Sequence, residues 1–149
     1  MINISDLNVR IGQRDILSNI NIEIEDGKWT CLVGPNGAGK TTLLKSLLGS
    51  LAYSGSITDG GVEVYKNHDR NVAFVPQHPQ IPIGMSVGEY VMLGRSKRDG
   101  WGNESNLSRN QVADVLKLTG LFGMQSQFVS LLSGGEMQRA LIARALVQE

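Results

Sequence analysis

Alternating apolar and polar positions predict that the chain begins with an antiparallel β-sheet. Residues 2–11 and 20–24 alternate in this way, with one change of phase at Asp6. A turn or bulge at Asp6 would produce the change, because one extra residue moves the following side chains to the other face. Asp26-Gly27 is a hairpin turn signal, and the apolar segment 28–33 after it is predicted as a further strand.

The pattern then changes to a helical period. Leucines at positions 43, 44, 47, 48 and 51 form one stripe, and Gly49 is expected to end that helix. Residues 55–75 are strand-like again, with Asp59-Gly60-Gly61 as a turn. Prolines at positions 76, 79 and 82 exclude a helix there and favour an extended loop.

The second half of the chain is predicted to be helical. A serine followed three residues later by Glu or Gln is a capping box, a motif that marks the start of a helix. Three such boxes are Ser86–Glu89, Ser108–Gln111 and Ser133–Glu136. A polar loop is expected over 96–107, and Gly120 should end the second helix. The third helix is mostly apolar from Met137 to Val147 and is expected to be buried.

The segment between the apolar residues 28–33 and the leucine stripe carries the clearest chemistry. It fits the phosphate-binding pattern G-x-x-x-x-G-K-[ST]. Glycines let backbone N–H groups approach phosphate oxygens, and the following helix directs its positive end at the anion. Lys40 is predicted to contact the β- and γ-phosphates and Thr41 to bind Mg²⁺. The predicted nucleotide contacts are Gly34, Pro35, Asn36, Gly37, Ala38, Gly39, Lys40, Thr41 and Thr42.

Composition limits the classes of protein. The chain has 149 residues, 41% of them hydrophobic, with 14 basic and 14 acidic side chains, so bulk charge gives no reason to expect a nucleic-acid partner. The single cysteine, Cys31, is expected to be a small buried hydrophobe and suits a reducing compartment. No signal peptide appears and no apolar run approaches membrane-spanning length, so any membrane span is expected to belong to another chain, in keeping with an expected cytoplasmic location.

A second glycine-rich turn leads into the last helix. Ser133, Gly134, Gly135 and Glu136 form it, and a helix N-terminus after such a turn is a candidate anion site. Gln77 ends a strand-like segment between the two glycine-rich stretches.

These residues resemble the ATP-binding cassette (ABC) transporter ATPases. The motifs match in order: 34–42, Gln77 after Val75-Pro76, and 132–136 leading into 140–146. The resemblance covers residues 1–149. It implies an α/β fold: a partial P-loop NTPase core with an N-terminal antiparallel β subdomain and an inserted α-helical subdomain. On this basis, residues 1–83 would form the β subdomain and nucleotide-binding core, 84–132 the helical subdomain and 133–149 the signature helix.

The resemblance also implies a mechanism and partners. Two such domains, in a homodimer or with a paired ABC subunit, would close head to tail around two ATP molecules. The Ser133 turn of one would then contact the γ-phosphate on the other's phosphate loop, and Gln77 would contact Mg²⁺ and the attacking water. Residues 85–95, ending in Leu-Gly-Arg, look like the iron-chelate, haem and cobalamin importers, and zinc and manganese importers have something close. The implied partners are integral membrane permease subunits, so the location would be peripheral on the inner face of the membrane.

The chain departs from the family pattern in two places. Ile11 stands where the family stacks adenine on an aromatic side chain. After Glu136 the single acidic residue is Glu149, and no histidine follows His78. The Mg²⁺-binding Asp, the catalytic Glu and the switch His therefore have no counterpart. The chain looks like the N-terminal part of an ABC ATPase, cut before its catalytic strand, and is expected to be inactive alone.

Two alternatives to an importer subunit are open. One is a soluble ABC-type ATPase acting on ribosomes or DNA, and the other is an inactive fragment. Gln77 and Ser133 are 56 residues apart, which leaves room for a small helical subdomain. Residues between them show no heptad array, so the long coiled coil of chromosome-type ATPases is not expected.

Overall fold

The computed structural model describes residues 1–66, 72–77, 79–95 and 106–148, which belong to two compact units, 1–70 and 71–149. Each unit has its own cluster of buried apolar side chains. The predicted subdivision at residues 83 and 132 stays a prediction.

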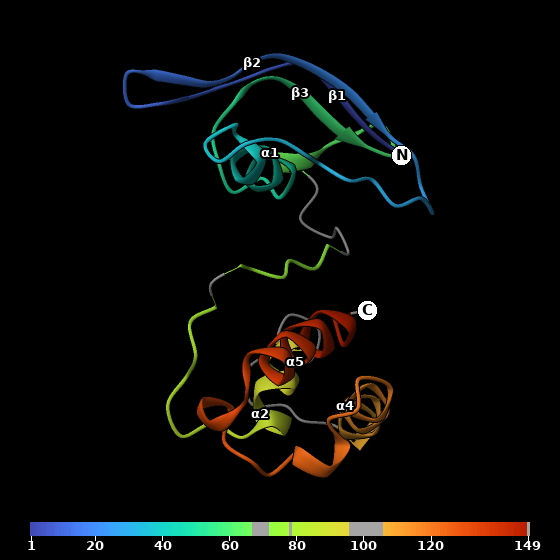
Figure 1. Cartoon of the computed structure of the whole chain (residues 1–149). Coiled ribbons are helices and arrows are strands. Elements are labelled where there is room, and N and C mark those ends of the chain that lie inside the picture. The colour runs from blue at the N-terminus through green and yellow to red at the C-terminus, as the bar shows by residue number, and fades with distance from the viewer. Residues whose placement is uncertain (67–71, 78, 96–105, 149) are drawn as a thin grey trace. The chain divides into compact units, whose positions relative to one another are not determined.

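The N-terminal unit is an antiparallel sheet with one helix packed on it (Figure 1). The sheet order is β2-β1-β3-β4. Its elements are β1 (Ile2–Ile11), β2 (Arg14–Ile24), α1 (Lys40–Leu47), β3 (Ser54–Asp59), β4 (Val62–Glu63) and a 3₁₀ turn (Val64–Lys66). Leu43 of α1 is buried with Leu7, Leu17 and Ile57 of the sheet, so burial of this apolar face holds the helix on the sheet.

The predicted change of phase at Asp6 is confirmed. Asp6 has a φ of 49°, and the pairing of β1 with β2 shifts between Ile4 and Leu7. A matching irregularity in β2 lies at Asn19, whose φ is 52°. Gly55 of β3 approaches the first bulge so closely that an added Cβ would lie 2.3 Å from the carbonyl oxygen of Asp6. Glycine is therefore required where β3 passes the bulge.

The predicted strand over 28–33 is wrong. Those residues have no strand assignment, Trp29 is fully exposed, and Cys31 is exposed instead of buried. Residues 72–75 are likewise outside any strand. A strand exists only where its N–H and C=O groups have a ladder partner, and within the described residues neither segment has one. Asp26-Gly27 does turn, with a φ of 69° at Gly27, but it opens no hairpin.

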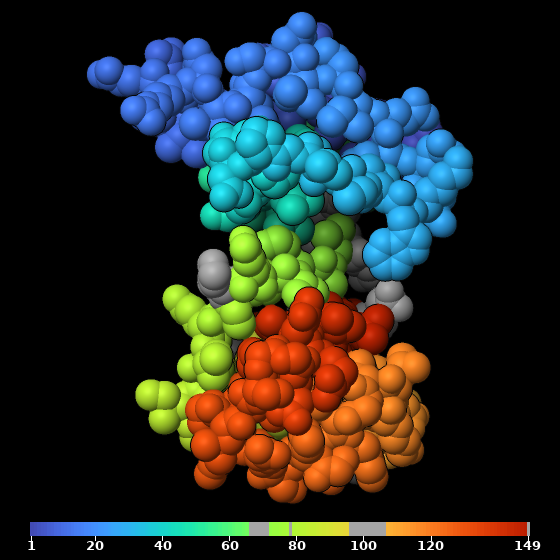
Figure 2. All heavy atoms as spheres, in the orientation of Figure 1, coloured from blue at the N-terminus to red at the C-terminus, as the bar shows by residue number. Residues whose placement is uncertain are grey.

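The C-terminal unit is helical. Its elements are α2 (Val87–Met92), a 3₁₀ turn (Leu93–Arg95), α4 (Asn106–Leu118), 3₁₀ turns at Phe122–Met124 and Val129–Leu131, and α5 (Gly134–Leu146). Contacts join α2, α4 and α5 around one core, and α4 and α5 form a continuous surface in Figure 2. Gly94 lies so close to α5 that an added Cβ would be 2.2 Å from the Arg144 carbonyl oxygen. The 3₁₀ turn Leu93–Arg95, which holds the Leu-Gly-Arg sequence, is thus in close contact with α5.

Two of the three predicted capping boxes are confirmed, at Ser86 and Ser133. The box at Ser108 is wrong, because α4 begins at Asn106 and Ser108 is buried inside its first turn. A capping residue needs a non-helical backbone, which a position within the helix does not have. The predicted loop over 96–107 lies mostly outside the described residues.

The predicted helix ends are confirmed. Gly49 and Gly120 have φ values of 69° and 68°, and the N–H groups of Ser50 and Leu121 close the last turns. The prediction that α5 is buried holds for one face, because Ala140 and Ala143 are buried while Ile142 is 42% exposed. No helix in the described part of the chain is long and apolar enough to span a bilayer.

Candidate nucleotide-binding site

The phosphate loop is a tight turn that leads directly into α1. Gly37 and Gly39 have φ values of 83° and 87°, a conformation that L side chains rarely adopt. The Ala38 N–H donates to the Pro35 carbonyl at 3.3 Å, and the Leu43 N–H donates to the Gly39 carbonyl at 2.9 Å. The glycines therefore serve as turn residues, as the motif predicts.

Lys40 lies over this loop. Its Nζ donates to the carbonyl oxygens of Gly34 and Pro35, each at 2.7 Å. An ammonium has three donors, so these bonds hold the side chain against the loop and keep its charge at the start of α1. A bound phosphate would lie near this ammonium and could exchange for a carbonyl as its partner.

The first turn of α1 is suited to an anion. Its N-cap is Gly39, which provides no side-chain cap, and the described first turn has no acidic residue. The first N–H groups of a helix have no partner within the helix, and their dipoles favour a negative charge. Thr41 is exposed beside them and Thr42 is half-buried.

The phosphate loop packs against strand β2 at Gly39. A Cβ at Gly39 would lie 2.7 Å from Leu17 Cδ2 and 3.2 Å from the Ile16 carbonyl oxygen. Gly39 therefore permits direct contact of the loop with this strand. Sequence reasoning missed this support by Ile16 and Leu17. The sequence signals only the irregularity in β2, because Leu17 and Ile20 are three residues apart where strand alternation requires two, and it does not show the contact with Gly39.

The second glycine-rich turn is ordered by its own capping box. The Glu136 carboxylate accepts from the Ser133 N–H at 2.8 Å and from the Ser133 hydroxyl at 2.7 Å. The hydrogen bond from the Ser133 side chain is the main cause that lowers the pKa of Glu136 below its usual range. Gly134 and Gly135 are exposed with open space around them. Their predicted contact with a nucleotide stays a prediction.

Gln77 and Ile11 are exposed. Gln77 lies outside the helices and strands, in the unit that also holds the Ser133 turn. Ile11, at the end of β1, is 52% exposed and offers apolar surface without an aromatic ring. The phosphate loop belongs to the other unit, 1–70, so each part of the predicted site is described by itself. The described residues contain no cluster of His, Cys, Asp and Glu able to hold a metal alone.

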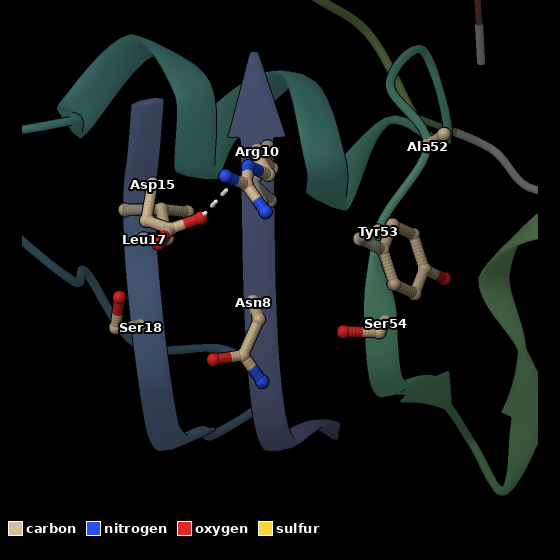
Figure 3. A pocket seen from close by; sticks show the side chains of 9 residues that line it. Asn8, Arg10, Asp15, Leu17, Ser18, Ala52, Tyr53 and Ser54 are labelled. Atoms are coloured by element: carbon tan, nitrogen blue, oxygen red, sulfur yellow. Dashed lines mark ion pairs between the residues drawn. The ribbon is translucent and has the colours of Figure 1, made fainter. Parts of the chain in front are cut away.

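A hollow of about 470 Å³ lies on the sheet (Figure 3). Asn8 and Arg10 of β1, Asp15 and Ser18 of β2, and Tyr53 contribute to its lining, and the Arg10 guanidinium is 3.5 Å from the Asp15 carboxylate. No residue from 34–42 lines it. The candidate nucleotide site is thus the exposed phosphate loop, which offers backbone N–H groups and the Lys40 ammonium to an anion.

A turn of this sequence and geometry at the start of a helix defines a phosphate-loop nucleotide-binding protein. Residues 17–149 match the ABC transporter family, and the chain belongs to that family.

Curated relatives agree with this assignment. The chain is 39% identical to the hemin import ATP-binding protein HmuV of Chelativorans sp. (strain BNC1), over 99% of this chain and 57% of the relative. It is 34% identical to the iron(3+)-hydroxamate import ATP-binding protein FhuC of Bacillus subtilis (strain 168), over 95% of this chain and 55% of the relative. The chain thus spans a little over half the length of these proteins.

Solved structures agree in fold. A metal-chelate type ABC transporter in an inward-facing conformation superposes with a TM-score of 0.83 at 26% identity, over 99% of this chain and 56% of that one. CbiO1 of Clostridium perfringens, part of the ABC transporter complex cbiONQ, gives a TM-score of 0.82 at 27% identity, with 99% and 61% coverage. The predicted fold class, a P-loop NTPase with an antiparallel β-sheet and a helical part, is confirmed.

Proposed function

We propose that the chain is the nucleotide-binding part of an ABC importer subunit, which couples ATP binding and hydrolysis to solute uptake. The observation that carries the proposal is the complete phosphate loop with Lys40 Nζ 2.7 Å from two of its carbonyls. The named relatives import hemin and iron(3+)-hydroxamate, which favours an iron chelate, haem or a related metal compound as the solute. Those names favour import over action on ribosomes or DNA.

In this proposal the metal is Mg²⁺, carried in with ATP. The exposed Thr41 hydroxyl beside Lys40 is the residue that would bind it on the phosphate side. Hydroxyl oxygen and phosphate oxygens are the hard ligands that Mg²⁺ prefers. Gln77 is the proposed contact to the metal and to the attacking water.

The proposed assembly joins two such domains with membrane permease subunits on the inner face of the membrane. The Ser133–Glu136 turn of one domain would complete the site of the other. The N–H groups at the start of α5 are donors suited to a γ-phosphate, and the exposed Ser133 hydroxyl would bind it by exchanging its bond to the Glu136 carboxylate for one to the phosphate.

Hydrolysis by these 149 residues alone is not part of the proposal. Residues 137–148 contain no Asp and no Glu, so no carboxylate follows α5 before Glu149. Phosphoryl transfer needs a group that positions the attacking water and a metal held on two sides. We propose that this sequence supplies the nucleotide-binding residues of the reaction and not its catalytic carboxylate.

We expect the surface for the membrane subunits to include the loop from Gln77 to Ser86 and the start of α2. Ile83 is 97% exposed there, whereas the neighbouring Met85 is held by a bond from the Val129 N–H to its carbonyl at 2.9 Å. In the complete protein, Ile83→Glu should abolish co-purification with the permease subunits and leave ATP binding unchanged. An isoleucine at an interface contributes about 1.5–3 kcal/mol, so its loss costs tenfold or more in affinity.

Leu107→Glu is the matched control, because Leu107 is also exposed, at 65%, but lies on α4. It should assemble normally. If Ile83→Glu assembles as well as Leu107→Glu, the contact surface is elsewhere.

The function itself is tested by uptake. The complete protein, reconstituted with its permease subunits in vesicles, should accumulate haem or an iron chelate when ATP·Mg²⁺ is present and should not when the nucleotide is omitted. ATP-independent accumulation would refute the coupling, and ATP-dependent uptake of neither solute would refute the substrate class.

A further inference from the structure

The β1–β2 pairing has three register shifts, and the first two, the bulges at Asp6 and Asn19, compensate each other. Across the first, Ile4 to Leu7 spans three residues while their partners Ile22 and Ile20 are two apart. Across the second, Leu7 to Val9 spans two residues while Ile20 to Leu17 spans three. The extra residue in β1 is therefore cancelled by an extra residue in β2. Both strands keep their apolar side chains on the core face on either side of the pair.

Polar side chains join these bulges. We name Asp6, Asn8, Asn19 and Asn21 the asparagine clasp. Asn21 Oδ1 accepts the Asp6 N–H at 2.9 Å, and Asn8 Nδ2 donates to the Asp6 carbonyl at 2.7 Å. Asn8 Oδ1 accepts the Asn19 N–H at 2.8 Å, and Asn21 Nδ2 donates to the Asn19 carbonyl at 3.2 Å. Asn8 thus bonds to the backbone of both bulges at once.

The clasp holds unfavourable backbone in place. Asp6 and Asn19 are the non-glycine residues with positive φ in the described chain, and both are of the type that tolerates it. Each such conformation costs about 1–3 kcal/mol and persists only when its surroundings enforce it. Without the clasp bonds, the segment between the bulges could slip by one residue in its pairing and remove both bulges, because the pairs on either side of them, Ile4–Ile22 and Val9–Leu17, already share one register.

Such a slip would act on the phosphate loop. Leu17 lies in β2 immediately beyond the second bulge. Its Cδ2 and the Ile16 carbonyl oxygen are the atoms that a Cβ at Gly39 would meet first. With both bulges removed, the side chains of the two strands would alternate without interruption from Ile4 and Ile22, so Leu17 would turn to the face opposite the core while its pairing with Val9 stays the same. Figure 3 shows Asn8 on β1 next to Leu17 and Ser18 on β2.

We propose that Asn8 is a positioning residue for the nucleotide, acting through the clasp, β2 and Gly39 on the phosphate loop. This inference rests on the proposed binding of nucleotide at residues 34–42. Asn8 does not contact the nucleotide. It sets the fraction of molecules in which the loop has its binding geometry, and the apparent affinity falls in proportion to that fraction.

The experiment compares binding of ATP·Mg²⁺ to the 149-residue chain and its variants by calorimetry. Asn8→Ala removes both bonds and should weaken binding about tenfold, as it would if only one molecule in ten kept the native pairing. Asn8→Asp keeps the acceptor for the Asn19 N–H and should recover most of the affinity. Asn21→Ala is the second clasp variant and should act in the same direction.

Two control variants distinguish an effect on the position of the phosphate loop from a general loss of folding stability. Ser18→Ala changes an exposed neighbour on β2 that lines the same hollow, and should bind like the natural chain. Ile57→Val removes a buried methyl group from β3, lowers stability by about 0.5–1.5 kcal/mol and should also leave affinity unchanged. Equal losses of affinity in Asn8→Ala and Ile57→Val would show a general effect of stability and overturn the proposal.

Nuclear magnetic resonance of the nucleotide-free chain gives a second readout. Asn8→Ala should move or double the amide signals of Gly37 and Gly39, and Ser18→Ala should not. Unchanged signals would overturn the inference even if no variant binds nucleotide. If Lys40→Ala loses binding while Asn8→Ala binds normally, the inference fails and the proposed site stands. If Lys40→Ala binds like the natural chain, the proposed site itself fails.

Discussion

Replacing Lys40 by alanine is expected to weaken the binding of ATP·Mg²⁺ by about ten- to a hundredfold. In the proposed site the substitution removes the charge that would contact the β- and γ-phosphates, where a charge-assisted hydrogen bond contributes about 1.5–3 kcal/mol. Calorimetric titration of both chains measures the difference. The structure places this ammonium 2.7 Å from the Gly34 and Pro35 carbonyls, at the start of α1.

Two controls accompany that comparison. Lys45→Ala removes an exposed lysine one turn further along α1 and should bind ATP like the natural chain. Thermal unfolding of Lys40→Ala should show that the chain still folds, because the lost bonds go to exposed loop carbonyls. Equal ATP affinities of the natural chain and Lys40→Ala would contradict the assignment of the loop.

The second large effect is expected in turnover. The 149-residue chain should release no phosphate from ATP above the level of Lys40→Ala. A chain extended by the family's Asp-Glu strand and switch His should turn over. The physical reason lies in the proposed mechanism: Thr41 and Gln77 would contact the Mg²⁺ on one side, while its other side and the group that positions water need carboxylates, which residues 137–148 lack.

Phosphate release measured side by side on the two chains tests this expectation. The extended chain with Glu→Gln at the catalytic position is the control, because it keeps shape and removes the carboxylate. Turnover by the short chain near the rate of the extended one, abolished by Lys40→Ala, would show that the catalytic residues lie within residues 1–149.

Two extended segments of the chain, residues 28–33 and 72–75, expose apolar side chains. Val33 is 85% exposed and Phe74 is 43% exposed, in the two extended segments that have no strand partner in the described chain. Both segments read as strands because their composition suits a buried sheet. We expect the isolated chain to be less soluble than a chain in which both segments are paired, since apolar extended segments without a ladder partner associate with one another.

Local chemistry made some features predictable from the sequence. The phosphate loop, the capping boxes at Ser86 and Ser133, and the helix ends at Gly49 and Gly120 each depend on a few neighbouring residues, and the structure has them where expected. The bulge at Asp6 was also predictable, because an extra residue in one strand is the usual cause of a change of phase in an alternating pattern.

Features that depend on distant partners were not predictable in this way. Cys31 was expected to be buried because its neighbours are apolar, yet burial requires a second surface that no local pattern supplies. Ser108 has the spacing of a cap, but α4 begins two residues earlier. The support of Gly39 by Leu17 joins residues far apart in sequence, and only their positions in space show it.

Titration of the natural 149-residue chain with ATP, ADP and AMP, each with Mg²⁺, tests the central claim most directly. The claim is that residues 34–42 bind a nucleotide through its phosphates. ATP and ADP should bind and AMP should not. In the proposed site the loop N–H groups and Lys40 would contact the phosphates beyond the first, whereas Ile11 would give the base no aromatic partner. Equal binding of AMP and ATP, or no binding of ATP and ADP, would contradict the account.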